Sequence, residues 1–309
     1  MKKLLVTGAS GLLGSHVARQ AAGRFDTLGL FQSFRPRDIP GRLEPLDLAN
    51  AAAVRSRLDA FRSDLIIHCA ALADADRAQR EPDLARRVNV DATATLAQSA
   101  RRLGAKMLLV STDLIFDGGK ATPYVENDPP CPLSLYGQTK LDAERIVQAG
   151  AGAWLIARAS LLYGPSPRGN RGLDERLGLA LRTGRAVKLF VDEFRCPIAA
   201  CDLAAALLEL ADSPHTGVFH LAGSERLSRY EIGMRIARRF GWPTATIEAS
   251  STRDVPMNPP RPTNLALDTD KARSVLQTKL RGLTETLESP SENSWGGCPP
   301  ACSSPPASA

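Results

Sequence analysis

The chain has few aromatic residues and no long apolar segment. Phenylalanine, tryptophan and tyrosine together make up 5% of its 309 residues, and no apolar run approaches the roughly 18 residues that cross a bilayer. Its start has no apolar stretch followed by a small-residue cleavage site, as a signal peptide would have. We therefore expect a cytoplasmic protein without a membrane partner.

Long basic runs are also missing, although basic residues are numerous. The formal net charge is +6, from 39 Lys and Arg residues against 33 Asp and Glu. These residues are scattered and are not interleaved with aromatic residues, which argues against nucleic-acid binding. The general positive field still attracts small anionic substrates.

The residues that usually bind metals are not suitably spaced. Cys298 and Cys302 have three residues between them and no histidine or cysteine partner nearby. Asp113, Asp117 and Asp128 are better explained as carboxylates of turns. We expect no metal site.

The first half of the sequence alternates strand-like and helical segments. Strands are predicted at residues 3–7, 26–31, 43–46, 64–69, 106–111 and 153–158. Helices are predicted near residues 12–22, 50–61, 83–103 and 134–149. This alternation predicts an α/β fold, a Rossmann-type doubly wound parallel sheet that binds ligands at the carboxyl ends of its strands.

The pattern divides the chain into three parts. Residues 1–160 form the predicted NAD(P)-binding domain, and residues 161–287 a smaller substrate-binding cap that can interleave with it. Within the cap, helices are predicted near 173–183, 202–212 and 228–240, with strands at 186–191 and 217–221. Residues 288–309 are rich in proline, serine and glycine and predict a disordered tail.

A glycine-rich turn follows the first strand. Gly8 and Gly11 allow a tight turn with close backbone approach, and Gly14 allows the next helix to pack against the strand. The helix begins at Leu12 and Leu13, whose backbone N–H groups point towards the turn. This arrangement predicts a site for the pyrophosphate of a dinucleotide.

The end of the second strand bears on the choice of cofactor. An NAD site usually has an acidic residue there to bind the ribose, but this strand is followed by Ser33 and Arg35 instead. These two residues suit a 2′-phosphate, although Arg35 and Arg37 can also be read as solvated loop residues. NADPH is the expected cofactor, with NADH as the alternative.

Tyr136 and Lys140 are four residues apart and so share one face of a predicted helix. The ammonium group and the positive end of the helix both favour a phenolate, so we expect the pKa of Tyr136 to be lowered. Thr112 lies at the end of a strand, where its hydroxyl can bind a carbonyl oxygen while Tyr136 protonates it.

Several motifs follow one another in the order that is typical of a known family. They lie at residues 68–71, 88–90, 111–118, 123–128, 136–140, 158–164, 202–204 and 261–268. Together they resemble the extended short-chain dehydrogenase/reductases, and within them the dTDP-4-dehydrorhamnose reductases. The similarity runs from about residue 3 to residue 276.

The resemblance implies roles for particular residues. Thr112, Tyr136 and Lys140 would be the catalytic residues, with Lys140 also holding the nicotinamide ribose. The other implied cofactor contacts are Asp47 and Leu48 at the adenine, Ala70 and Ala71 beside the cofactor, and Asn89.

The implied function is NADPH-dependent reduction of a nucleotide-linked 4-keto sugar, as in dTDP-rhamnose biosynthesis, with a homodimer as the possible assembly. The substrate would meet Thr112, Asp113 and Tyr136, and Arg195 or Arg261 would bind its diphosphate. For each arginine the alternative is a surface ion pair. Leu161 stands where these reductases usually have tryptophan, so the sugar is left open. Two other functions also remain open, an epimerase or dehydratase of the same superfamily and a non-catalytic NADP-binding regulatory subunit.

Overall fold

The computed structural model describes residues 1–255 and 257–288. A seven-stranded sheet forms its centre, and every pair of neighbouring strands is parallel. The strand order is β11 (Gly217–Leu221), β6 (Trp154–Ala159), β5 (Lys106–Thr112), β4 (Leu65–His68), β1 (Lys3–Thr7), β2 (Asp26–Phe31) and β3 (Arg42–Pro45). The doubly wound α/β fold expected from the sequence is confirmed.

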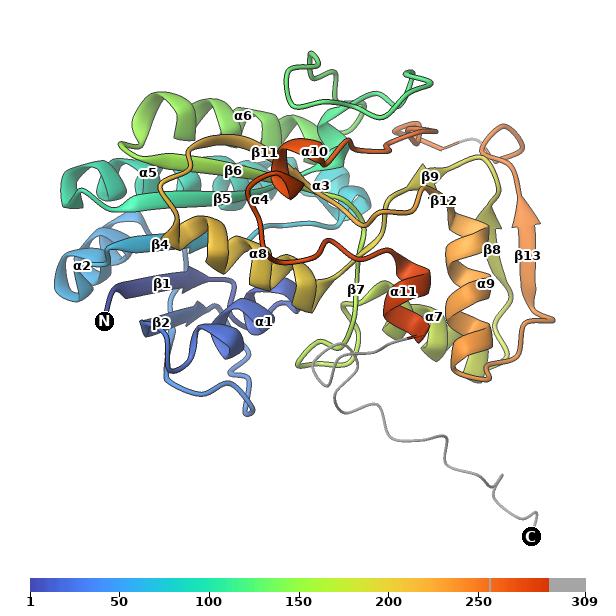
Figure 1. Ribbon diagram of the computed structural model, residues 1–309, viewed down its shortest axis with the longest axis horizontal. Helices are drawn as coiled ribbons and strands as arrows, with labels where there is room; N and C mark the ends of the chain where they lie inside the picture. The colour runs from blue at the N-terminus through green and yellow to red at the C-terminus, as the bar shows by residue number, and fades with distance from the viewer. Residues whose placement is uncertain (256, 289–309) are drawn as a thin grey trace, which may run out of the picture.

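Helices cover both faces of this sheet (Figure 1). Three of them contribute to the core on one face, α2 (Ala51–Phe61), α5 (Ala92–Leu103) and α6 (Leu135–Gly150). The other face packs against α1 (Leu12–Ala21) and α8 (Ala200–Asp212). Neighbouring strand residues Ile66 and Ile67 point into opposite cores, which is why β4 is apolar at consecutive positions.

The helix expected at 83–103 is interrupted. The chain forms α3 (Ala75–Arg80), α4 (Pro82–Arg86) and a π-helical turn (Arg87–Asp91) before α5. Pro82 can start α4 because the first helical position needs no backbone N–H. Wide π turns often occur at functional sites, and this one carries Asn89.

A second lobe lies beside the carboxyl ends of the strands, on the right in Figure 1. It contains α7 (Leu173–Arg182), α9 (Arg229–Arg239) and α11 (Leu283–Glu288), with β8 (Val187–Phe190) paired to β13 (Ile247–Ser250). Its apolar core includes Leu177, Ile232, Ile236, Ile247 and Leu287. Strand β13 was not expected from the sequence.

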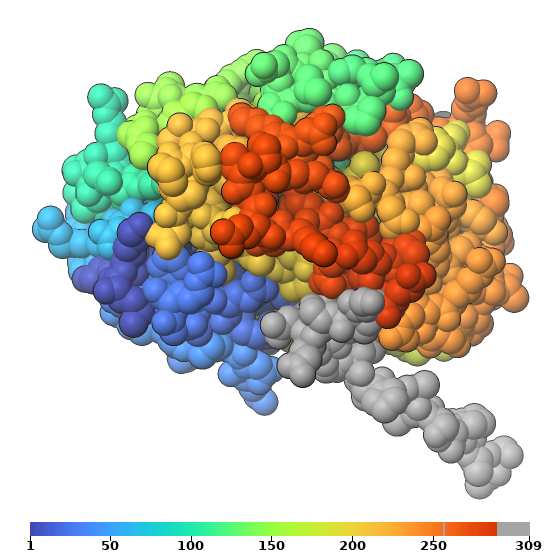
Figure 2. Space-filling view, in the orientation of Figure 1, coloured from blue at the N-terminus to red at the C-terminus, as the bar shows by residue number. Residues whose placement is uncertain are grey.

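The chain passes between the lobes more than once. Helix α8 and strand β11 return to the large sheet, and α10 (Asp270–Arg273) packs near β11. Short pairs join β10 (Ile198–Ala199) to β7 (Leu162–Tyr163) and β12 (Leu227–Ser228) to β9 (Phe194–Arg195). The last described residues, orange to red in Figure 2, lie across the junction of the lobes.

The tail expected at 288–309 lies outside the described residues, apart from Glu288, which ends α11. None of the described helices is both long and apolar enough to cross a membrane.

Candidate active site

The glycine-rich turn between β1 and α1 has no room for side chains. Gly8 has a φ of +71°, and a Cβ there would lie 2.8 Å from the backbone nitrogen of Ala70. A Cβ on Gly14 would collide with the carbonyl oxygen of Gly8. The close approach brings Ala70 and Ala71 beside the turn, so these two predicted regions meet.

Helix α1 begins at this turn without a capping side chain. Gly11 occupies the N-cap position, so the first backbone N–H groups of the helix are left without a side-chain acceptor. Leu13 is buried in the core and Leu12 is half-buried, which leaves their backbone rather than their side chains to face a ligand. This cradle fits the pyrophosphate of a dinucleotide.

The loop after β2 presents the two residues expected to select the cofactor. Ser33 and Arg35 are exposed, and neither side chain has a partner within the described residues. Asp47 is also exposed and accepts a hydrogen bond from the backbone of Ala49 at 3.0 Å, while Leu48 packs against the apolar core. A phosphate contact by Ser33 and Arg35 stays a prediction.

Helix α6 presses against the turn that follows β5. The N-cap Ser134 accepts a hydrogen bond from the backbone of Gly137 at 3.1 Å, and a Cβ on Gly137 would collide with the carbonyl oxygen of Leu114. This packing places the phenol of Tyr136, which is 8% exposed, close enough to Thr112 for the two side chains to interact.

The expected lowering of the Tyr136 pKa is wrong. Burial raises the pKa of this phenol, and the charge of Asp113 raises it further, while the hydrogen bond with Thr112 acts in the opposite direction. Burial is the largest cause, because an ionised phenolate that is buried loses its water. Tyr136 is therefore held in its protonated form, the form that can donate a proton.

Lys140 lies one helical turn further along the same face and is 2% exposed. Burial lowers the pKa of its ammonium to about 8, and Glu144 and Cys69 act in the opposite direction. Glu144 is itself paired with Arg158 at 2.9 Å. Within the described residues no group hydrogen-bonds the Lys140 ammonium, so its donors are available to a ligand such as a ribose.

Asn89 uses its side chain to hold the neighbouring loop in place. Its Oδ1 accepts a hydrogen bond from the backbone of Leu72 at 2.8 Å, and its Nδ2 donates to Thr139 at 2.9 Å. These bonds position the loop that carries Ala70 and Ala71. Asn89 thus supports the predicted cofactor region, and a direct contact with the cofactor stays a prediction.

Asp113 connects the predicted catalytic residues to the cap. Thr112 Oγ1 donates to Asp113 Oδ1 at 3.2 Å, and Ser160 Oγ donates to Asp113 Oδ2 at 2.9 Å. Arg195 Nε lies 3.9 Å from the same carboxylate, and Arg195 Nη2 pairs with Glu193 at 3.0 Å. Arg195 therefore lies beside the candidate site, but its charge is already compensated.

Arg261 has a partner across the two lobes, because its Nη2 lies 3.0 Å from Asp76 Oδ1 in α3. Sequence reasoning missed a third arginine, Arg229, whose Nε lies 3.9 Å from Glu193. One signal could have found it. Arg229 is the first residue of α9, a position that favours acidic rather than basic side chains.

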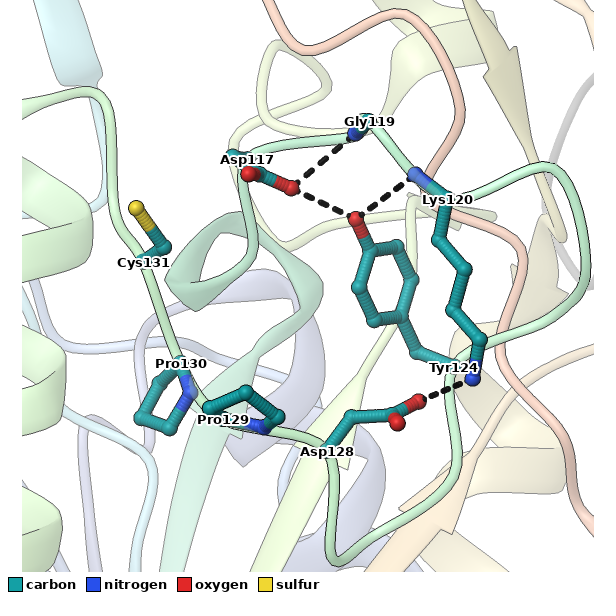
Figure 3. A pocket seen from close by; sticks show the side chains of 8 residues that line it. All are labelled: Asp117, Gly119, Lys120, Tyr124, Asp128, Pro129, Pro130 and Cys131. Carbon is teal, nitrogen blue, oxygen red and sulfur yellow. Dashed lines mark hydrogen bonds and ion pairs between the residues drawn. The ribbon is translucent and has the colours of Figure 1, made fainter.

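Three acidic residues considered for a metal do not converge. Asp117 and Asp128 line an open hollow with Lys120 and Tyr124 (Figure 3), whereas Asp113 lies in the site described above. Tyr124 donates to Asp117 at 2.7 Å and Lys120 pairs with Asp128 at 2.5 Å. The polar groups of this hollow satisfy one another, which is how the carboxylates of a structural loop behave.

Comparison with known proteins places the chain in a family. A family model described as the RmlD substrate binding domain matches residues 1–293. Methionine adenosyltransferase 2 subunit beta from Xenopus laevis is 33% identical over 298 residues, which are 93% of this chain and 87% of that protein. A probable low-salt glycan biosynthesis reductase from Haloferax volcanii is 33% identical over 288 residues, 91% of this chain and 95% of that protein.

Solved structures show the same likeness. The dTDP-4-dehydrorhamnose reductase of Bacillus anthracis, crystallised in complex with NADP, superposes with a TM-score of 0.80 at 25% sequence identity. The match covers 93% of this chain and 98% of that one.

Proposed function

The chain belongs to the RmlD substrate binding domain family of extended short-chain dehydrogenase/reductases, and on that premise we propose that it is an NADPH-dependent reductase of a nucleotide-linked 4-keto sugar. The contact between the hydroxyls of Thr112 and Tyr136, with Lys140 one turn away, is the observation that carries this proposal. A bound, reduced nicotinamide supplies the hydride for the carbonyl carbon.

The residues of the chain supply the rest of the chemistry. Tyr136 donates its proton to the carbonyl oxygen, and its raised pKa keeps that proton in place until a substrate arrives. Thr112 has a single hydroxyl proton, which it donates to Asp113 in the structure. To polarise a carbonyl, the Thr112 hydroxyl turns from Asp113 towards the substrate oxygen.

The choice of cofactor rests on residues of the first lobe. The uncapped start of α1 fits a pyrophosphate, the ammonium of Lys140 fits the nicotinamide ribose, and Ser33 and Arg35 suit the 2′-phosphate that distinguishes NADP from NAD. The relative from Bacillus anthracis binds NADP, which supports NADPH as the cofactor, with NADH as the alternative.

A screen of NADPH oxidation against a panel of nucleotide-linked keto-sugars tests the function. We expect one substrate class to be reduced, and Tyr136→Phe to lower turnover by about 10²–10⁴-fold with little change in NADPH affinity. Full activity of Tyr136→Phe would rule out the proton donor. Tightly held NAD with no net cofactor consumption would indicate an epimerase or dehydratase instead.

A second candidate function is a non-catalytic, NADP-binding regulatory subunit. The similarity to the beta subunit of methionine adenosyltransferase 2 favours it, whereas the complete set of Thr112, Tyr136 and Lys140 favours catalysis. Size-exclusion chromatography with a methionine adenosyltransferase catalytic subunit separates the two functions. A stoichiometric complex together with no turnover on any keto-sugar would support the regulatory role.

A further inference from the structure

Four arginines from different parts of the cap approach one another near the candidate active site. Arg229 starts α9, Arg195 lies in β9, Arg176 lies in α7, and Arg261 lies in the loop before α10. The charges of the other three all act on the guanidinium of Arg229. Like charges gathered in a partly buried place are costly unless an anion compensates them.

The neighbouring acids compensate Arg195 and Arg261 better than Arg229. Glu193 lies 3.0 Å from Arg195 but 3.9 Å from Arg229, and Asp76 pairs with Arg261 at 3.0 Å. Within the described part of the chain, Arg229 has no hydrogen bond to its guanidinium, although its side chain is only 20% exposed. Its donors are thus unused within the described residues and available to a ligand.

The position of Arg229 in its helix adds to this imbalance. It is the first residue of α9, where the partial positive charge of the helix end disfavours a cation. Burial lowers the pKa of Arg229 to about 10, Glu193 opposes that shift, and the three other arginines add to it.

We propose that Arg229 is the principal contact for the phosphate groups of a nucleoside-diphosphate substrate, ahead of Arg195 and Arg261. The planar fork of its guanidinium suits two phosphate oxygens. A bound diphosphate compensates the excess positive charge of the four arginines. This inference rests on the proposed function, and it names a residue that determines which substrates bind.

The geometry connects this contact with the reacting atoms. Asp113 lies between Thr112 and Arg195, and Glu193 lies between Arg195 and Arg229. In a 4-keto sugar nucleotide, the carbonyl is on the opposite side of the pyranose ring from the phosphate-bearing carbon. A substrate with its carbonyl at Thr112 can therefore direct its diphosphate towards Arg229.

Calorimetric titration of the full-length chain with dTDP tests the proposal, with UDP, GDP and inorganic pyrophosphate as further probes. We expect Arg229→Gln to weaken the binding of the preferred nucleotide about tenfold or more, and inorganic pyrophosphate to compete for the site. Arg229→Lys keeps the charge and loses the fork, so its affinity should fall between those of Arg229→Gln and the wild type. Arg238→Gln, an exposed arginine in the last turn of the same helix, is the matched control and should leave the affinity unchanged.

Melting temperatures separate this role from a structural one. Because the charge of Arg229 is poorly compensated, Arg229→Gln should melt no lower than Arg238→Gln. Unchanged nucleotide affinity in both Arg229 variants would overturn the proposal, as would a wild-type chain that binds none of the four probes. Weaker binding in Arg229→Gln without turnover on any keto-sugar would retain the phosphate contact and reject the reductase. Turnover of Arg229→Gln with a wild-type KM would support the reductase and reject the phosphate contact at Arg229.

Discussion

At the scale of single residues, the candidate site combines groups whose pKa values are shifted by burial. Burial keeps Tyr136 protonated and lowers the pKa of Lys140. The same holds for His68, whose Nδ1 lies 2.7 Å from Thr7 Oγ1 and whose Nε2 lies 3.1 Å from Thr93 Oγ1. Burial lowers the pKa of His68 to about 3, and the charge of Lys140 adds to the shift.

The pKa of His68 predicts a loss of stability in mild acid. Its folded-state pKa of about 3 lies below the unfolded value of about 6.5, so its contribution is complete above pH 6.5 and is lost as the pH falls towards 3. Between pH 7 and pH 5 this one group should cost about 2 kcal/mol of unfolding free energy. Urea unfolding at both pH values measures the loss, and His68→Asn should reduce it. An equal loss in the variant would show that His68 already titrates normally in the folded chain.

Arg35 gives a prediction about the cofactor. Arg35→Ala should weaken NADPH binding by about 1.5–3 kcal/mol, the value of a charge-assisted contact, and leave NADH binding unchanged. Calorimetry with both cofactors measures the difference, and Arg37→Ala, another exposed arginine of this loop, is the control. Equal effects on NADPH and NADH would remove Arg35 from the phosphate site.

Sequence reasoning proposed residues that the structure brings together in the candidate site, but it did not predict their electrostatics. The strand end at Thr112 and the four-residue spacing of Tyr136 and Lys140 are local features, so they can be read from the chain. The direction of the Tyr136 pKa shift depends on burial and on Asp113, which only the folded structure reveals. Arg229 was missed for the same reason, because its neighbours come from three separate segments.

At the scale of elements, the position of α6 depends on one glycine. A side chain at Gly137 would meet the carbonyl oxygen of Leu114 in the turn that carries Thr112. Gly137→Ala should therefore displace the start of the helix, cost about 1–3 kcal/mol of stability and lower kcat. The matched control is Gly150→Ala at the end of the same helix, where the nearest atom to the new Cβ lies 3.7 Å away. Thermal melts and turnover assays compare the two variants. Equal melting temperatures and equal kcat values would mean that the contact between residue 137 and Leu114 adjusts without cost.

The elements themselves were largely predictable, because apolar runs and glycine turns are local signals. The interruption of the expected 83–103 helix was not. The π-helical turn carries Asn89, whose amide reaches Leu72 and Thr139 in other segments, and such long-range contacts cannot be read from the local sequence. Strand β13 was missed because Glu248 and Ala249 are exposed, so it lacks the apolar pattern by which a buried strand is found.

At the scale of the whole molecule, ion pairs fasten the last described segment across both lobes. Asp202 at the start of α8 accepts two hydrogen bonds from Arg281, at 2.8 Å and 2.7 Å, and the two side chains are 11% and 15% exposed. Removing one partner of such a pair leaves the other, mostly buried charge less well compensated. Asp202→Asn should therefore destabilise the protein by about 3 kcal/mol.

The control lies at the other end of the same helix. Asp212 pairs with Lys2, but the two side chains are 43% and 55% exposed, so Asp212→Asn should change stability by about 0–1 kcal/mol. Chemical denaturation of both variants measures the difference. Similar losses of stability in the two variants would show that solvent exposure does not determine how much these ion pairs contribute to stability.

The place of β11 has a consequence for synthesis on the ribosome. This strand completes the large sheet beside β6, yet it follows α7, β8 and α8 in the chain. Until residue 221 has emerged, the nascent sheet keeps an open edge at β6, and one of its faces lacks the cover of α8. The cofactor lobe can therefore complete its folding only after much of the cap has been translated. A gene fragment that ends at residue 160 encodes an unfinished core rather than a portable nucleotide-binding module.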